Sequence, residues 1–183
     1  MNRPARDRAR HLSRLPVLAG VIAVLSGCST AIQVCPVPAI LSDTATYTAF
    51  RPGTTPDLAN ELYSVSLINA DTDCRYTART GNVRSSLDLT FRATRAPSAE
   101  RARYTVPYFV VAHEGAKIFT KRLLSLTFEF APGASVATIK QSPDDTTIHV
   151  ENGKLPWNYQ LISGFQLTPE QIEYNKKKAR YAP

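Results

Sequence analysis

Strict alternation of apolar and polar residues is the feature that most constrains the fold of this chain. The clearest case runs from 124 to 130, where every even position is leucine or phenylalanine and every odd one is Ser, Thr or Glu. A second case is Leu-Asp-Leu-Thr-Phe-Arg over 87–92, and apolar residues at 63, 65 and 67 give a third. Because successive side chains of a β-strand point to opposite faces, this period of two predicts strands with one buried face.

Turn-forming residues separate these segments. Glycine, proline, asparagine and aspartate gather around 51–53, 80–82, 113–115, 132–133, 142–145 and 151–153. The longest predicted hairpin joins 106–112 to 117–130 through the turn at 113–115. Roughly seven or eight strands at this spacing predict an all-β fold, a single antiparallel β-sandwich. An immunoglobulin-like strand order is compatible with the spacing, and a closed β-barrel is the alternative fold.

The end of the chain changes to a helical pattern. Thr168 and Gln171 have the spacing of a capping box, with proline at the first helical position between them. Leu167 and Ile172 stand where a hydrophobic staple would pack. The sequence therefore predicts a short C-terminal helix over about 169–179. Its basic end suits the helix dipole and is interpreted as a solvated terminus, with contact to anionic lipid or cell wall as the alternative.

The first 27 residues have the composition of a targeting segment. Five arginines and one aspartate occupy residues 1–14, and an uncharged apolar run follows from Leu15 to Leu25. This run is too short for a permanent membrane span, which needs roughly 20 residues. The segment Leu25-Ser-Gly-Cys28 resembles the lipobox of bacterial lipoproteins, in which the cysteine sulfur takes a diacylglycerol and the preceding peptide bond is cut.

This resemblance implies a mature chain that begins at Cys28 and is held to a bacterial membrane by its lipid. Serine rather than aspartate at position 29 favours the outer membrane over the inner membrane, with the protein facing the periplasm. The expected organisation is a signal peptide over 1–27, a lipidated tether over 28–38 and a sandwich domain over 39–183. An ordinary secretory signal, with Cys28 incidental, is the alternative. Removal of residues 1–27 leaves a formal net charge of 17 − 14 = +3.

Two further cysteines form a natural pair. Once Cys28 carries lipid, Cys35 and Cys74 are an even number of thiols in an oxidising compartment, which predicts a disulfide. A zinc or redox pair is the alternative. It lacks a Cys-x-x-Cys spacing, and only His113 and His149 follow residue 27.

Motifs of catalysis and metal binding are not evident in the sequence. The chain has no serine nucleophile elbow, no His-Glu-x-x-His helix, no phosphate loop and no dinucleotide fingerprint. His113 and His149 are interpreted as surface histidines. The oxygen-rich stretch 69–73 lacks the glycine and glutamate of a calcium loop and is interpreted as an acidic turn. We therefore expect no catalytic residue, no metal and no cofactor beyond the lipid on Cys28.

A run of arginines is the main candidate for binding. Seven arginines and no lysine lie between 75 and 103, with only two acidic residues among them. Arginine is suited to bidentate contact with carboxylate or phosphate. Arg92, Arg95, Arg101 and Arg103 are the candidate residues for an acidic protein, lipopolysaccharide or cell-wall partner. The alternative is that solvent-facing positions are simply arginine-rich. Nucleic acid is not expected, because basicity alone is not a binding motif.

Several segments together resemble an uncharacterised family of alphaproteobacterial envelope lipoproteins. They include Cys35-Pro, Phe50-Arg-Pro-Gly, Cys74-Arg-Tyr and, most specifically, Gly-Phe-Gln-Leu-Thr-Pro-Glu-Gln over 164–171. The resemblance implies an envelope location and a single domain, and it brings no catalytic residues. We expect a non-catalytic binding or structural module. An assembly or chaperone factor acting by strand addition and a periplasmic hydrolase with an unrecognised site are the alternatives.

Overall fold

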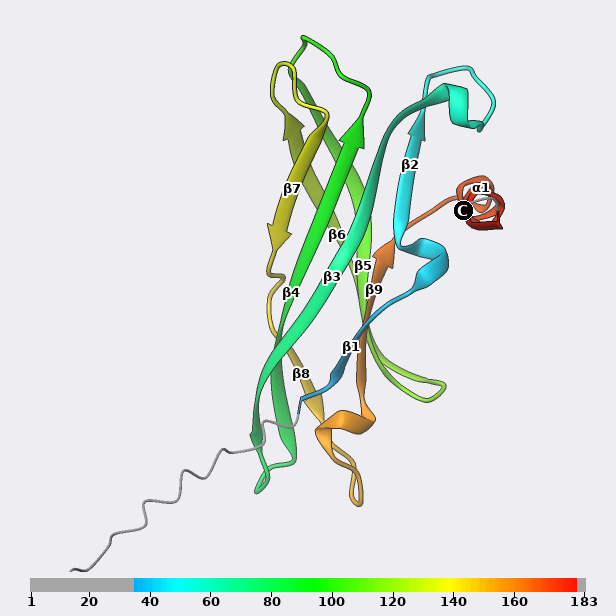
Figure 1. Ribbon diagram of the computed structural model, residues 1–183. Coiled ribbons are helices and arrows are strands. Elements are labelled where there is room, and N and C mark those ends of the chain that lie inside the picture. Colours follow the sequence, from blue (N-terminus) through cyan, green and yellow to red (C-terminus); the bar gives the residue numbers. More distant parts are fainter. Residues whose placement is uncertain (1–34, 181–183) are drawn as a thin grey trace, which may run out of the picture. The chain divides into compact units, whose positions relative to one another are not determined.

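The computed structural model describes residues 35–180, and within them nine strands form two sheets that pack face to face (Figure 1). The first sheet has the order β1-β9-β5-β6, formed by Val37–Ile40, Gln160–Phe165, Ala102–Glu114 and Lys117–Phe130. The second has the order β2-β3-β4-β7, formed by Thr46–Phe50, Glu61–Thr77, Asn82–Arg95 and Val136–Gln141. Strand β8 (Thr146–His149) also pairs with β4, nearer the β3–β4 turn. Only β1 and β9 pair in parallel.

The single antiparallel β-sandwich that the alternation predicts is confirmed. The predicted long hairpin is β5–β6, which pairs from Ala102–Phe130 to Glu114–Lys117. The strand order differs from that of an immunoglobulin domain, whose last two strands share one sheet. Here β8 belongs to the second sheet and β9 to the first.

The inward faces of both sheets supply the core. Every second residue of β4 is buried: Val83, Ser85, Leu87, Leu89, Phe91 and Ala93. Aromatic rings pack at one end, where the Tyr63 ring centroid lies 4.1 Å from that of Tyr104 and 5.7 Å from that of Phe128. Burial, with smaller effects of Tyr47 and Tyr104, raises the pKa of Tyr63 to about 12. Burying each large side chain contributes roughly 1.5–3 kcal/mol, so these strands determine the stability of the fold.

The predicted C-terminal helix is confirmed as α1, Pro169–Arg180. Its capping box is present: the Thr168 backbone N–H donates to Oε1 of Gln171 at 3.0 Å, and the Gln171 N–H donates to the Thr168 hydroxyl at 3.3 Å. Leu167 belongs to the core cluster and Ile172 packs against that cluster, while the predicted staple contact between the two stays a prediction. No helix in residues 35–180 has the length and apolarity to cross a membrane.

Two sequence-based expectations differ from the structure, and the N-terminal ones lie outside it. The stretch 69–73 is part of β3 and not an acidic turn, because its residues pair continuously with β4 after an irregularity at Ile68. Val37 and Pro38, expected in the tether, begin β1. The signal peptide over 1–27 and the lipidation of Cys28 fall outside the described residues.

Candidate functional site

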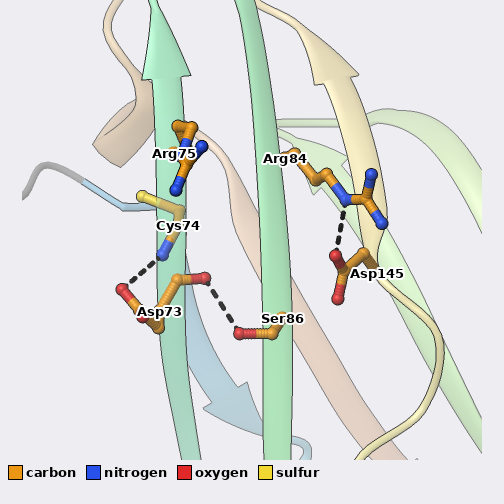
Figure 2. Close-up of a pocket in the computed structure, with 6 residues that line it drawn as sticks. All are labelled: Asp73, Cys74, Arg75, Arg84, Ser86 and Asp145. Carbon is orange, nitrogen blue, oxygen red and sulfur yellow. Dashed lines mark hydrogen bonds and ion pairs between the residues drawn. The ribbon is translucent and has the colours of Figure 1, made fainter.

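A shallow groove lies on the outer face of the second sheet, near the turn that joins β3 to β4 (Figure 2). Its volume is about 440 Å³, and it is open to solvent. The lining residues come from β3, from β4 and from the segment between β7 and β8: Asp73, Cys74, Arg75, Arg84, Ser86 and Asp145. We refer to these six residues as the polar groove.

The turn at residues 78–81 sets the geometry of the polar groove. The Gly81 N–H donates to the Ala78 carbonyl at 3.3 Å, and Gly81 has a φ of +67°, a conformation that favours glycine. This turn pairs Thr77 with Asn82, and the register then places Arg75 directly opposite Arg84. Directly opposed residues point to the same face of a sheet, so both guanidinium groups leave from the outer face.

Two like charges directly opposite each other on a sheet repel. The two arginines of the polar groove differ in whether a carboxylate pairs with them. Nε of Arg84 lies 2.5 Å from Oδ2 of Asp145, in an ion pair exposed to solvent. Within residues 35–180 the structure gives the Arg75 guanidinium no hydrogen-bond or ion-pair partner, although its backbone pairs with β4. An anion placed between the two arginines would relieve their repulsion and compete with Asp145 for Arg84. The groove is therefore suited to binding a phosphate or carboxylate group.

The remaining polar groups of the groove are held by the local backbone. Oδ1 of Asp73 accepts a hydrogen bond from the Cys74 N–H at 2.8 Å, and the Ser86 hydroxyl donates to the Asp73 carbonyl at 3.3 Å. The Ser86 hydroxyl oxygen has further capacity to accept or donate. The geometry supplies two guanidinium groups and a hydroxyl for binding, beside the carboxylates of Asp73 and Asp145.

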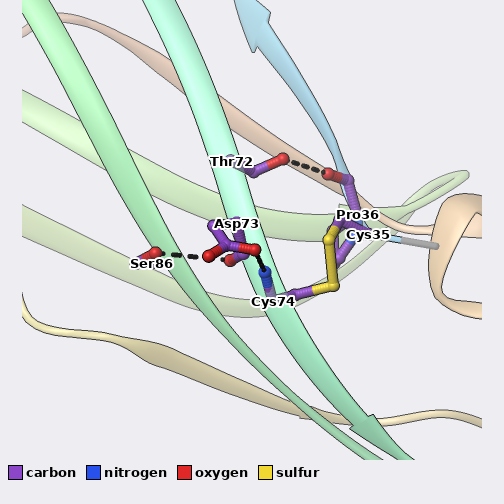
Figure 3. Close-up of a disulfide and its surroundings, with 6 residues drawn as sticks. All are labelled: Cys35, Pro36, Thr72, Asp73, Cys74 and Ser86. Atoms are coloured by element: carbon purple, nitrogen blue, oxygen red, sulfur yellow. Dashed lines mark hydrogen bonds between the residues drawn. A yellow bond between two sulfur atoms is a disulfide. The ribbon is translucent and has the colours of Figure 1, made fainter. Parts of the chain in front are cut away.

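The predicted disulfide between Cys35 and Cys74 is present beside the polar groove (Figure 3). Its Cα atoms are 5.5 Å apart, within the range that the bond requires. Next to it, the Thr72 hydroxyl donates to the Pro36 carbonyl at 2.9 Å. The start of the first sheet is thus fastened to β3 of the second sheet at this point.

The four arginines predicted from the sequence do not converge on one surface. Arg92 lies on the outer face of β4, the face that carries the polar groove, whereas Arg103 lies on β5 in the other sheet. Nη1 of Arg101 lies 3.3 Å from Oε1 of Glu129. Arg95 has a structural role, because its guanidinium donates to three backbone carbonyls and stacks 4.7 Å from the Phe130 ring centroid. Contact of these residues with an anionic partner stays a prediction.

Neither histidine after residue 27 forms the histidine–carboxylate pair that a hydrolase site would require. His113 contacts the Gly115 carbonyl and Oε1 of Gln160, each at 3.0 Å, and His149 contacts Oδ1 of Asn82 at 3.1 Å. Among residues 35–180 there is no group of three or more His, Cys, Asp or Glu side chains able to hold a metal ion.

Arg75 and Arg84 belong to the arginine run but are not among the four candidate residues predicted from the sequence. The signal that identifies them is the predicted turn at 80–82. A tight turn fixes which residues of the two strands lie opposite each other, and counting outward from it pairs 75 with 84.

Comparison with known proteins gives no relative for this fold and groove. The chain matches no protein-family model, no curated protein and no solved structure. The resemblance to envelope lipoproteins therefore stays a prediction.

Proposed function

We propose that this protein is a lipid-anchored, non-catalytic binding module of a bacterial cell envelope. The lipid is carried by Cys28, and the protein faces the periplasm, with the outer membrane favoured. It binds a partner that presents an anionic group, such as an acidic protein, a lipopolysaccharide phosphate or a cell-wall peptide. The polar groove is the proposed contact site, and Arg92 extends the same face.

The observation that carries this proposal is the opposed pair Arg75 and Arg84. Strand pairing holds both side chains on one solvent-facing surface, and among residues 35–180 the structure gives an ion pair for Arg84 and none for Arg75. Arginine stems are costly to order, so a preformed pair on a rigid sheet lowers the entropy cost of binding a phosphate or carboxylate. The sandwich holds the two arginines on a rigid sheet. In the solvent-facing ion pair, an anionic group of the partner can replace the Asp145 carboxylate at Arg84.

The first experiment is crosslinking of the native protein in envelope membranes, followed by identification of the captured partners by mass spectrometry. Arg75→Gln with Arg84→Gln should abolish capture of a specific partner. The matched control is Arg101→Gln with Arg103→Gln, which removes the same charge from outside the groove and should leave capture unchanged.

A third variant gives a change of opposite sign. Asp145→Asn removes the competing carboxylate from Arg84 and should increase capture of an anionic partner. Equal capture by the groove variant, the control variant and the wild-type protein would rule out the polar groove as the binding site.

The anchor is tested separately by metabolic labelling with an alkyne fatty acid. The wild-type chain should incorporate the label, and Cys28→Ala should not. Label that persists in the Cys28→Ala chain, or its absence from the wild-type chain, would contradict the lipid anchor.

A further inference from the structure

The outer face of the first sheet carries apolar residues at the end where β1 begins, whereas its other end is polar, with Arg103 opposite Glu129 and Thr105 opposite Thr127. Opposed residues on neighbouring strands share a face, so the pairing of β1, β9, β5 and β6 assigns residues to this surface. Successive rows away from the start of β1 contribute Val37 and Ile118, then Ile162 and Val111, then Leu123 and the buried Phe109. We refer to these six apolar residues as the apolar face. Gln160 and His113 lie between Val37 and Ile118, and Lys121 lies beside Val111.

Much of the apolar face is open to solvent. Leu123 is 64% exposed, Ile118 63% and Val37 42%. The outer face of an antiparallel sandwich is normally polar, as it is along β4, where Arg84, Ser86 and Asp88 occupy alternate positions. Exposed apolar side chains gathered at one end of a sheet, with polar residues between them, are a candidate for a site of interaction.

The apolar face continues into the 3-10 helix η3, Pro156–Asn158, which comes directly before β9. The Val37 N–H donates to the Tyr159 carbonyl at 2.9 Å, so η3 lies beside the start of β1. At this end Trp157 is 47% exposed and Leu155 40% exposed. Tryptophan is enriched at membrane surfaces, where its ring is apolar and its N–H finds a polar partner.

Ion pairs hold the turns together at the same end. Lys117, at the start of β6, and Lys154, after β8, both hydrogen-bond to Glu151. These hydrogen bonds lower the pKa of Glu151 to about 2, and the bond from Lys117 has the largest effect. Lys154 also lies 2.8 Å from Oε2 of Glu114. The exposed apolar side chains are therefore presented by an ordered surface at neutral pH.

We propose that the apolar face and η3 rest on the surface of a lipid bilayer. Val37, on the first row of this face, follows Cys35 by two residues. Cys35 lies only 35 − 28 = 7 positions after Cys28, which carries the proposed lipid. An extended chain of that length spans at most about 25 Å, so the anchor would keep the face within reach of the membrane.

The charge at the apolar face fits lipid headgroups. Nζ of Lys121 lies 5.5 Å from the Phe109 ring centroid and forms no ion pair with a described residue. A lysine with an apolar stem beside an aromatic ring can extend its ammonium to a lipid phosphate. A stable anchor generally takes two signals, and this face would supply the second beside the proposed lipid. The inference thus rests on the proposed anchor.

The test uses the lipidated protein reconstituted in phosphatidylglycerol-containing vesicles, with Trp157 as the probe because it is the one tryptophan of the chain. Brominated lipids should quench its fluorescence. Aqueous acrylamide should quench it less in the vesicle-bound protein than in soluble protein without detergent. Ile118→Ser with Leu123→Ser should abolish the quenching by brominated lipid while the chain still floats with the vesicles. The matched control, Leu62→Ser with Val136→Ser, changes two exposed aliphatic residues of the second sheet and should have no effect.

Two other outcomes would overturn the proposal. Wild-type protein that floats with vesicles but shows no quenching by brominated lipid does not place this face on the bilayer. Protection of Trp157 from acrylamide that depends on protein density, without quenching by lipid, would assign the face to a second copy of the chain. Failure of the wild-type protein to float would instead refute the anchor, which distinguishes the two proposals.

Discussion

Gly164 lies where the 3-10 helix η1, Ser42–Thr44, passes over β9, and a larger side chain has no room there. A Cβ at this position would lie 2.1 Å from Oγ1 of Thr44 and 3.0 Å from Cζ of Phe109. Thr44 cannot move easily, because it is buried and its hydroxyl donates to the Leu41 carbonyl at 3.1 Å. At the scale of single residues, the absence of a side chain is what allows η1 to lie against the first sheet.

We predict that Gly164→Ala lowers the free energy of unfolding by about 1–3 kcal/mol, the usual cost of overpacking. Urea denaturation of the purified protein measures this change. The neighbouring Ser163→Ala is the control. The Ser163 hydroxyl is fully buried and has no hydrogen-bond partner among the described residues, so its removal should leave stability unchanged or slightly higher. Wild-type stability of Gly164→Ala would contradict the close packing of η1.

At the scale of elements, helix α1 covers the free edge of β2. Nε2 of Gln171 donates to the Thr48 carbonyl at 3.0 Å, and Nδ2 of Asn175 donates to the Thr46 carbonyl at 2.8 Å. One helical turn advances about 6 Å over four residues, and a strand advances nearly 7 Å over two, so the amides match the alternate carbonyls. A covered edge does not favour strand addition at β2.

Loss of this cover should both destabilise the protein and expose the edge. We predict that Gln171→Ala and Asn175→Ala each lower the free energy of unfolding by about 1 kcal/mol, the typical net worth of one hydrogen bond. The double variant should also self-associate through β2, measurable by light scattering. Lys177→Ala changes an exposed residue of the same helix and should do neither. A monomeric, fully stable double variant would show that the amides do not protect the edge.

The elements themselves were predictable because their signals are local. Period-two alternation marked β4 and β6, and the Thr168–Gln171 box marked the start of α1. The strand over 69–73 was missed because aspartate and asparagine are common in turns. In β3 these polar residues lie at alternate solvent-facing positions, and pairing with β4 outweighs their local preference.

At the scale of the whole molecule, the set of residues that share an outer face depends on which strands are neighbours. The opposition of Arg75 and Arg84 follows from one short turn and could be predicted from the sequence. The apolar face could not, because it requires β9 to lie between β1 and β5, strands far apart in the chain. The spread of Arg92 and Arg103 over different sheets has the same cause.

One covalent bond joins these two sheets at the edge where the first one begins. The disulfide from Cys35, just before β1, to Cys74 of β3 closes a loop with a sequence separation of 39. In the chain-entropy model, closing a loop of this length stabilises the fold by about 4 kcal/mol, because it restricts the unfolded chain. The hydrogen bond from Thr72 to Pro36 holds the same junction but contributes only about 1 kcal/mol.

We predict that Cys35→Ser with Cys74→Ser lowers the free energy of unfolding by about 4 kcal/mol while the sheets keep their order, since the core does not depend on the bond. Urea denaturation with and without a reducing agent measures this. Reduction should bring the wild-type protein to the stability of the variant and leave the variant unchanged, which separates the effect of the bond from that of the serines. Equal stability of oxidised wild-type protein and variant would mean that β1 is held by its pairing with β9 alone. In that case the junction next to the polar groove would depend on hydrogen bonds, and its rigidity would have to come from the β3–β4 pairing.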